Sequence, residues 1–455
     1  MACVWIVALM QVSCYPEPIA DDVEILEGDM VEHTLVMYLN ANNNLATHIL
    51  ANANDAERGM LGVPASTRLV IYLDKQSSTT LYEVKFLQYG SYNFVKHSTV
   101  LKEYPDQVST TPEVMKAVFE DIKVLAPSKT YGLVHAGHGS GWFPTPDSGI
   151  GYENQKNRPG SVFDTLLATS SIIADEYDFG FFNAEAPLTR AMGYDNDGSK
   201  KRYTTTEEFV EGISPIRFDY IIFDACFMSS VEFLYELRNV TDYVIASPVE
   251  VMGPGFPYED IMPLLMAPNH SLTAVCEKIM EVYRNDRTFS KYDSAAVALI
   301  DCSKLEGLTD CVADVWSAIS SANEATESEV ASLIATEIDK KAVQVLDRMR
   351  PAGFYDLKDY VEQLAIRDGE AFDLTDFNTA LAEAVVFADN TTEITSYGYP
   401  SNNTIPMLGY GVIDPKAGSD KVRLCGLSCY IPSVNAPVTQ SYYFQTSWSR
   451  KVYGL

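Results

Sequence analysis

The sequence predicts an α/β fold built on a mostly parallel sheet with helices on both faces. Short continuous apolar runs, typical of strands buried on both sides, recur through the first two thirds of the chain. Single helical stretches separate several of these runs, which favours parallel crossover connections. Polar or glycine-rich turns follow several of the runs, as they do at the carboxyl edge of such a sheet.

The expected elements alternate along the chain. Strands are predicted at 34–39, 68–73, 131–135, 220–223, 243–247 and 295–300, with an antiparallel excursion at 81–87. Helices are predicted at 45–58 and 111–125, and the second has Pro112 at its first position, as helix starts prefer. Residues 143–206 show little periodicity, and an insert of this length inside a domain is usually functional or mobile.

The character of the chain changes after Cys302. Helical spacing predominates at 305–319, 330–349, 357–364 and 377–387, whereas 426–431 and 442–448 are predicted as strands that pack back on the sheet. We therefore expect one domain at 34–302, which contains the 143–206 insert, and a mainly helical unit at 303–455. The acidic residues 15–33 are expected to form a tether.

The composition excludes several classes of protein. A chain of 455 residues, 47% of them hydrophobic, can bury a large core. The formal net charge of −29 argues against nucleic-acid binding and against a polybasic membrane surface. Such acidity would attract cationic peptides, although solubility outside the cell explains it equally well.

The first 14 residues form an apolar run of about the length of a signal-peptide core. Val12-Ser13-Cys14 resembles the end of a bacterial lipobox, in which the Cys is lipidated after export. No Lys or Arg precedes the run, and Gln11 stands where an aliphatic residue is usual. We expect export and lipidation of Cys14, so that the protein reaches the membrane only through a lipid anchor.

Six of the eight cysteines lie beyond this leader, too few for a disulfide scaffold and without zinc-finger spacing. Cys425 and Cys429 could form a bridge in an oxidising compartment, but two small core residues are the favoured interpretation. Cys226 differs from the others because it follows the strand at 220–223 and precedes a helical period. A thiol near a helix amino terminus is favoured as the thiolate.

A nucleophilic Cys needs a base, and His138 in a glycine-flanked turn after the strand at 131–135 could supply it. Gly139 lacks a Cβ, so its N–H could approach a substrate carbonyl and stabilise an oxyanion together with the N–H of Cys226. A packing role for Cys226 and a helix-capping role for Asp224 are the structural alternatives. His135, inside the strand, is expected to be structural.

These motifs resemble the clostripain family, in the caspase-like clan of cysteine peptidases. The resemblance rests on YLNANNNL at 38–45, HGSGW at 138–142, DACFMSSVEFLYELRNVTDYVIAS at 224–247, MGPGFPY at 252–258 and GLSCYIP at 426–432. It implies a caspase-like fold and an endopeptidase that forms a thioester. His138 would be the catalytic histidine, Cys226 the nucleophile, and the N–H groups of Gly139 and Cys226 the oxyanion hole.

The resemblance also implies where a substrate binds. Asp224 would form the acidic floor of a pocket for Arg or Lys before the cut, because a carboxylate selects a cation. Ser247 and Glu250 would line the same site. Family members often carry a further acidic residue after the fifth strand, and since 252–256 has none, Glu250 is the candidate substitute. We expect protein or peptide substrates and a monomer.

The insert contains two further candidate sites. Clostripain-like enzymes often activate by self-cleavage in this region, and Lys200-Lys201-Arg202 would suit such an enzyme, although a solvated basic cluster is the alternative. Residues 195–199 resemble the opening of a calcium loop, but Thr206 stands where its Glu is expected, so we interpret them as a turn. We expect no required cofactor and leave a calcium requirement open.

Two competing functions stay open. A catalytically silent surface protein could use the same fold to bind glycans or proteins, but the intact His and Cys motifs speak against it. A serine hydrolase that used Ser140 would need a nucleophile elbow, and His138 occupies the place of its first Gly.

Overall fold

The computed structural model describes the chain in segments. These are residues 30–75, 78–89, 93–142, 194–197, 200–286, 294–320, 326–347, 352–367, 370–392, 394, 424–433, 440 and 442–455. Residues 1–29, which include Cys14 of the expected leader and most of the expected tether, lie outside these segments. Residues 143–193 of the expected insert also lie outside them. Among the described residues, no helix is long and apolar enough to cross a membrane.

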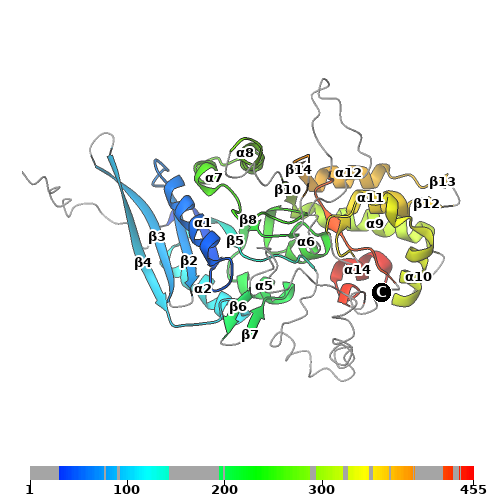
Figure 1. The fold of residues 1–455 in the computed structure, drawn as a ribbon, viewed down its shortest axis with the longest axis horizontal. Coiled ribbons are helices and arrows are strands. Elements are labelled where there is room, and N and C mark those ends of the chain that lie inside the picture. Colours follow the sequence, from blue (N-terminus) through cyan, green and yellow to red (C-terminus); the bar gives the residue numbers. More distant parts are fainter. Residues whose placement is uncertain are drawn as a thin grey trace, which may run out of the picture.

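A nine-stranded sheet runs through the molecule in the order β14-β10-β9-β8-β5-β1-β2-β3-β4 (Figure 1). Its strands are β1 Val31–Asn40, β2 Thr67–Lys75, β3 Ser78–Tyr89, β4 Asn93–Tyr104, β5 Ser128–Ala136, β8 Phe218–Asp224, β9 Thr241–Ala246, β10 Ala296–Asp301 and β14 Val385–Asn390. The five strands from β9 to β2 are parallel. Antiparallel pairs add β10 and β14 at one edge and β3 and β4 at the other. The predicted mostly parallel α/β sheet is therefore confirmed.

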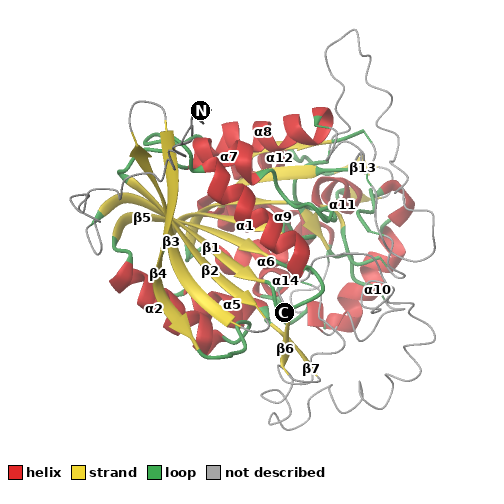
Figure 2. Ribbon diagram, turned by 60° about the vertical axis from the view of Figure 1, so that its left-hand side comes forward, coloured by secondary structure: helices red, strands yellow, loops and turns green. Residues whose placement is uncertain are grey.

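Helices cover both faces of this sheet (Figure 2). One face carries α1 Ala46–Gly59, α7 Tyr258–Leu265 and α8 Leu272–Asn285, and the other carries α2 Pro112–Leu125, α5 Thr206–Ile213 and α6 Val231–Leu237. The start of α2 is as predicted, since the Thr111 side chain accepts a hydrogen bond from the Val114 N–H and Pro112 follows. The central strands are buried between the two helical layers, which explains their continuous apolar sequences.

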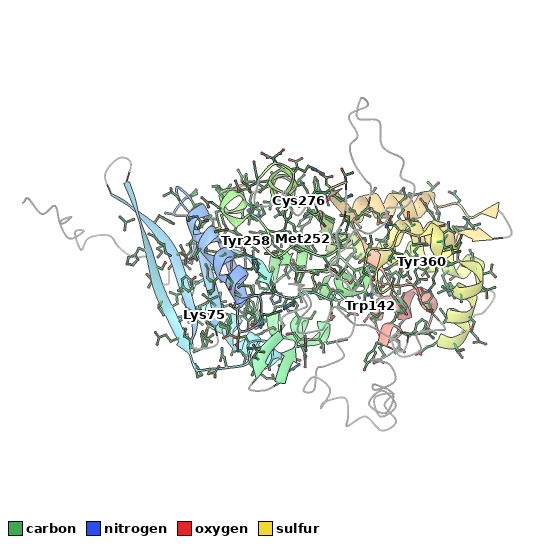
Figure 3. All side chains as sticks on the ribbon, in the orientation of Figure 1. Lys75, Trp142, Met252, Tyr258, Cys276 and Tyr360 are labelled. Carbon is green, nitrogen blue, oxygen red and sulfur yellow. The ribbon has the colours of Figure 1, made fainter. Side chains whose placement is uncertain are left out.

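The C-terminal part is mainly helical, as expected. Its helices are α9 Leu305–Ile319, α10 Glu327–Glu337, α11 Leu357–Leu364, α12 Thr375–Ala384 and α14 Ser447–Tyr453, with 3₁₀ turns at Cys302–Lys304 and Lys340–Ala342. Short strands form two small pairs, β11 Tyr355–Asp356 with β15 Ser428–Cys429, and β12 Ile366–Arg367 with β13 Glu370–Ala371. Tyr360, labelled in Figure 3, is fully buried here, and its hydroxyl lies 2.8 Å from that of Tyr453.

Several local predictions were wrong. Residues 442–448 do not form a strand, because α14 begins at Ser447 with the Thr446 side chain as its cap. A short buried apolar run does not distinguish a strand from a helix. The helix predicted at 330–349 ends at Glu337, and the one predicted at 377–387 gives way to β14 at Val385. The strand predicted at 295–300, in contrast, is present as β10, and it runs antiparallel to its neighbour β9.

Candidate active site

The His and Cys motifs follow two neighbouring parallel strands. Ala136, the last residue of β5, lies opposite Asp224, the last residue of β8. The N–H of Gly137 donates to the Asp224 carbonyl at 3.5 Å, which continues the pairing beyond the strands. His138 and Cys226 each stand two residues past that matched pair, so both leave the sheet at the same edge. Figure 1 shows β5 and β8 side by side at the centre of the sheet.

Gly139 brings the two turns into direct contact. A Cβ added to Gly139 would lie 2.1 Å from the carbonyl oxygen of Cys226 and 2.6 Å from its nitrogen. Real Cβ atoms do not approach main-chain atoms so closely, so only glycine fits without a shift of the backbone. The turn that carries His138 therefore lies against the turn that carries Cys226.

The loop after β9 covers the thiol of Cys226. The side chain is fully buried, and Sγ accepts a hydrogen bond from the Val251 N–H at 3.3 Å. The same loop pairs with the residues after Cys226, because the N–H of Phe227 donates to the Val249 carbonyl and that of Ser229 to the Ser247 carbonyl. The thiol of Cys226 is therefore shielded from solvent in this structure.

Backbone strain follows the cysteine directly. Phe227 has a φ of 58°, and it is the sole non-glycine residue with a positive φ in the described part of the chain. Such a conformation costs roughly 1–3 kcal/mol. The Phe227 ring stacks on Phe354 with centroids 4.3 Å apart and an interplanar angle of 6°, which anchors the strained turn to the C-terminal part. On the histidine side, the indole N–H of Trp142, a residue labelled in Figure 3, donates to the Gly353 carbonyl at 3.3 Å.

Asn44 holds the ring of His138. The Nε2 atom of His138 lies 2.6 Å from Oδ1 of Asn44. An amide oxygen can only accept, so Nε2 carries the ring proton in the neutral imidazole and Nδ1 keeps a lone pair. His138 is largely buried, and its Nδ1 is the nitrogen that can accept a proton. In the sequence, Asn44 is one residue of the YLNANNNL motif, which carries no signal of its contact with His138.

Asp224 is fully buried at the end of β8. Its Oδ2 accepts hydrogen bonds from Asn52 Nδ2 at 3.1 Å, the Phe256 N–H at 3.2 Å and the Tyr258 hydroxyl at 3.0 Å. Figure 3 labels Tyr258, at the start of α7. The carboxylate is therefore held from α1 and from the segment that enters α7. The alternative role of Asp224 as a cap of the next helix is not seen, because Ser230 precedes the first residue of α6.

The start of α6 also corrects an expectation about the thiol. This helix begins at Val231, five positions after Cys226, and spans seven residues. Cys226 lies too far before Val231 for the first turn of α6 to act on the sulfur, since the dipole effect falls off within one turn. The Sγ atom instead contacts the main chain of Val251, on the loop after β9.

The other predicted substrate-site residues lie on the loop beyond β9. Ile222 of β8 pairs with Ile245 of β9, so Ser247 leaves the sheet beside Asp224. Ser247 is buried, and its Oγ accepts from the Val249 N–H at 3.2 Å. Glu250 is also buried, next to Val251 at the thiol.

The predicted processing site lies in a hairpin of β6 Tyr194–Asp197 and β7 Lys200–Tyr203. The side chains of Lys200 and Lys201 are outside the described residues. Arg202 is buried, and its guanidinium pairs with both carboxylate oxygens of Glu208, at 2.7 and 3.1 Å. Residues 198 and 199 of the turn predicted at 195–199 lie outside the described residues.

The remaining thiols and His135 fit structural roles. No disulfide joins the described cysteines, and Cys425 and Cys429 are free thiols. Burial raises the pKa of the Cys276 and Cys302 thiols well above the ordinary value, which disfavours the reactive thiolate. His135 is packed among aromatic rings, and burial lowers its pKa to about 4, so it stays neutral.

No group of three or more His, Cys, Asp or Glu side chains suited to a metal ion occurs in the described segments.

Known proteins match this chain over most of its length. The chain is 22% identical to clostripain from Hathewaya histolytica over 463 residues, which cover 91% of this chain and 77% of that protein. A secreted C11 cysteine protease from Bacteroides thetaiotaomicron, solved with an irreversible peptide inhibitor, superposes with a TM-score of 0.66 at 24% identity and covers 92% of this chain and 98% of its own. An inactive zymogen C11 protease from Parabacteroides distasonis gives 0.67 at 22% identity, with 93% and 99% covered. These structures share the fold.

The family is shown by sequence. A model of the clostripain family matches residues 172–452, which is more than half of the chain. The family expected from the sequence motifs is therefore confirmed. The protein belongs to the clostripain family of cysteine peptidases.

Proposed function

We propose that this peptidase is an exported endopeptidase that cuts proteins or peptides after Arg or Lys, with His138 and Cys226 as its catalytic dyad. The observation that carries the proposal is the contact of Gly139 with the Cys226 backbone at the matched ends of β5 and β8. Two residue types able to act as base and nucleophile leave the sheet at one edge, on turns that touch. That is the arrangement that nucleophilic catalysis by a thiol requires.

The proposed reaction starts from the neutral His138 tautomer that has its proton on Nε2, next to Asn44 Oδ1. Nδ1 takes the thiol proton of Cys226, and the thiolate attacks the substrate carbonyl carbon. The N–H groups of Gly139 and Cys226 stabilise the oxyanion that forms. His138 then returns the proton to the departing amine, which leaves a thioester on Sγ. Water, deprotonated by His138, hydrolyses the thioester and restores the thiol.

Specificity for a basic residue rests on Asp224. Hydrogen bonds from Asn52, Phe256 and Tyr258 fix the orientation of this buried carboxylate. Asp224 stands two residues before Cys226 in the sequence. A cationic side chain that enters beside Cys226 would meet this negative charge in a site with little water, where the attraction is strong. Glu250 is the candidate second acid, and Ser247 lies on the same loop.

Self-processing is proposed at Lys200 or Lys201 rather than at Arg202. The Arg202 guanidinium is buried and paired with Glu208, so it is not presented to a second molecule. A related C11 protease is described as an inactive zymogen, which supports a precursor form. The purified Cys226→Ala protein should remain one chain on a denaturing gel while the wild type splits, and Lys200→Ala with Lys201→Ala should also stay whole. Splitting of the Cys226→Ala protein during incubation alone would contradict self-processing.

The remaining parts of the proposal concern location and assembly. A related C11 protease is described as secreted, which supports export, and we propose lipidation at Cys14. We further propose a catalytic domain at 34–302, a C-terminal unit at 303–455 and a monomeric enzyme without a required cofactor. A Cys14→Ala variant should leave the membrane fraction, and EDTA should leave the activity unchanged. Loss of activity in EDTA with recovery in calcium would instead show a calcium requirement.

Fluorogenic peptides test the proposed activity directly. Substrates that end in Arg or Lys before the fluorophore should be cleaved by the wild type and not by the Cys226→Ala or His138→Ala proteins. An iodoacetamide-type probe should block the enzyme and a fluorophosphonate should not. Equal cleavage by the wild type and the Cys226→Ala protein would remove the basis of the proposal.

A further inference from the structure

The β6–β7 hairpin packs against the turn after β1, and this turn contains Asn44, which contacts the His138 ring. We propose that Asn44 is a positioning residue for the His138 ring, and that the hairpin keeps Asn44 in place by clamping Asn42. The proposal rests on the proposed role of His138 as the base. It connects His138 with the β6–β7 hairpin, which lies more than 50 residues further along the sequence.

The clamp consists of main-chain and side-chain hydrogen bonds between Asn42 and the hairpin. The Asn42 carbonyl accepts from the Asn196 N–H at 3.2 Å and from Asn196 Nδ2 at 2.7 Å. The Asn42 side chain donates in return to Asp195 Oδ1 at 2.5 Å and to the Asn196 carbonyl at 3.3 Å. Four hydrogen bonds to one residue fix both its backbone and its side chain relative to β6.

The turn between Asn42 and Asn44 is short and internally bonded. Asn43 Nδ2 donates to the Asn40 carbonyl at 2.9 Å, and Asn43 Oδ1 accepts from the Leu45 N–H at 2.8 Å. The Asn42 N–H is directed to Asn40 Oδ1 at 3.3 Å. Because these bonds tie the turn to the end of β1 and to the start of α1, a shift of Asn42 moves Asn44 as well.

A buried carboxyl pair anchors the hairpin from its other side. Asp195 and Asp74 are both fully buried, and Ser109 bridges them. The Ser109 N–H donates to Asp195 Oδ2 at 2.6 Å, and the Ser109 hydroxyl donates to Asp74 Oδ2 at 2.5 Å. Two carboxyl groups in one buried site cannot both ionise readily, so a proton is held there. The hairpin is thus fixed to the end of β2 as well as to the turn after β1.

The hydrogen bond to Asn44 affects the tautomer and the pKa of His138 as well as the position of its ring. The hydrogen bond from Nε2 to Oδ1 selects the tautomer with the lone pair on Nδ1, and it strengthens when the ring becomes positively charged during the reaction. A residue of this kind changes kcat and the pH profile more than it changes substrate binding. A merely structural residue would not shift the pH profile.

Substitution of Asn44 tests the positioning role. Asn44→Ala should lower kcat by about 10- to 100-fold with little change in KM, and it should move the acid limb of the kcat/KM profile to lower pH, because the imidazolium loses its acceptor. Asn44→Asp keeps an acceptor and adds a negative charge, so it should retain more activity and move that limb to higher pH. Asn378→Ala, at an exposed position of α12, is the matched control and should behave as the wild type.

The hairpin clamp is tested by Asn42→Ala. This variant should reproduce the kcat loss and the pH shift of Asn44→Ala at smaller size, and the double variant should lose less than the two single losses combined. Melting temperatures of all variants are compared so that loss of fold is recognised, and Asn44→Asp keeps the test decisive if Asn44→Ala does not fold.

The outcomes separate this inference from the proposed function. If Asn44→Ala keeps the wild-type kcat and pH profile, or if Asn44→Asp is folded but as inactive as Asn44→Ala without any pH shift, Asn44 does not position His138. An unchanged Asn42→Ala would overturn the role of the hairpin. The proposed dyad fails separately, by activity that survives in the Cys226→Ala or His138→Ala protein.

Discussion

Gly139 lies against the main chain of Cys226, and a Cβ at residue 139 would come within 2.1 Å of the Cys226 carbonyl oxygen. The glycine therefore serves two purposes at once. It lets the histidine turn approach the cysteine turn. It also carries one of the two N–H groups proposed to stabilise the oxyanion. The close approach of the two turns thus depends on the absence of a side chain at residue 139.

The first prediction is a large loss of activity in Gly139→Ala. The added methyl group would push the His138 and Cys226 turns apart, and we expect kcat/KM to fall by roughly 100-fold, since small displacements of catalytic groups have effects of that size. Gly307→Ala is the matched control, because nothing lies within 4 Å of a Cβ there and Gly307 is in α9. That variant should keep its activity and gain up to about 1 kcal/mol of stability. Wild-type activity in Gly139→Ala would contradict the close approach.

The second prediction concerns the charge of Asp224. Asp224→Asn preserves the size of the side chain and an acceptor oxygen for Asn52, Phe256 and Tyr258, but removes the negative charge. We expect kcat/KM for Arg and Lys substrates to fall by about 100-fold, because a cation would enter a site without its counter-charge. Asp376→Asn, at an exposed position of α12, should change nothing. An equal loss on substrates with a neutral residue before the cut would assign Asp224 to structure instead of specificity.

The third prediction is about stability. Arg68 and Glu83 form an ion pair between β2 and β3 at 3.0 Å, with side chains only 2% and 4% exposed. Glu83→Gln should lower the free energy of unfolding by about 3 kcal/mol, because it leaves a guanidinium in a buried site without its carboxylate. Glu32→Gln removes one partner of the exposed Lys129–Glu32 pair and should cost less than about 1 kcal/mol. Urea denaturation of both variants checks the contrast, and equal costs would contradict it.

The fourth prediction is a pH dependence of stability that Glu232 causes. Burial raises the pKa of its carboxyl to about 8, although the Tyr430 N–H, which donates to Oε1 at 2.7 Å, acts in the opposite direction. The folded pKa thus exceeds the unfolded value of roughly 4.3. The contribution of Glu232 to stability is complete below that unfolded value and is lost as the pH rises through about 8.

Glu232→Gln tests this sign. The amide resembles the protonated carboxyl and does not titrate, so the melting temperature of the variant relative to wild type should rise between pH 5 and pH 9. Glu277→Gln, at an exposed position of α8, serves as the comparison. A difference in melting temperature that stays constant across this pH range would show that Glu232 does not titrate there.

The sequence predicted those parts of the site that depend on local patterns. The apolar runs of β5 and β8 and the turns after them located His138, Gly139 and Cys226, because strands buried on both faces and glycine turns have clear local signatures. The covered state of the Cys226 thiol was not predictable in this way. It depends on the Val251 main chain, which carries no side-chain signal.

Long-range polar contacts were also missed. The contact of Asn44 with His138 joins residues 94 positions apart, and that of Asn42 with Asp195 joins residues 153 apart. Nothing in the run of asparagines at 42–44 indicates which amide faces the ring and which faces the hairpin. Only the packing of β6 on the turn after β1 decides this.

Mapping of the reactive residue tests the central claim most directly. The wild-type protein would be treated with a peptidyl chloromethyl ketone that ends in Arg, digested, and analysed by peptide mass spectrometry. We predict one adduct, on Cys226, and its loss in the His138→Ala protein, where the thiol has no base. An adduct on Cys276 or Cys302, or undiminished labelling of Cys226 in His138→Ala, would contradict a dyad formed at the matched ends of β5 and β8.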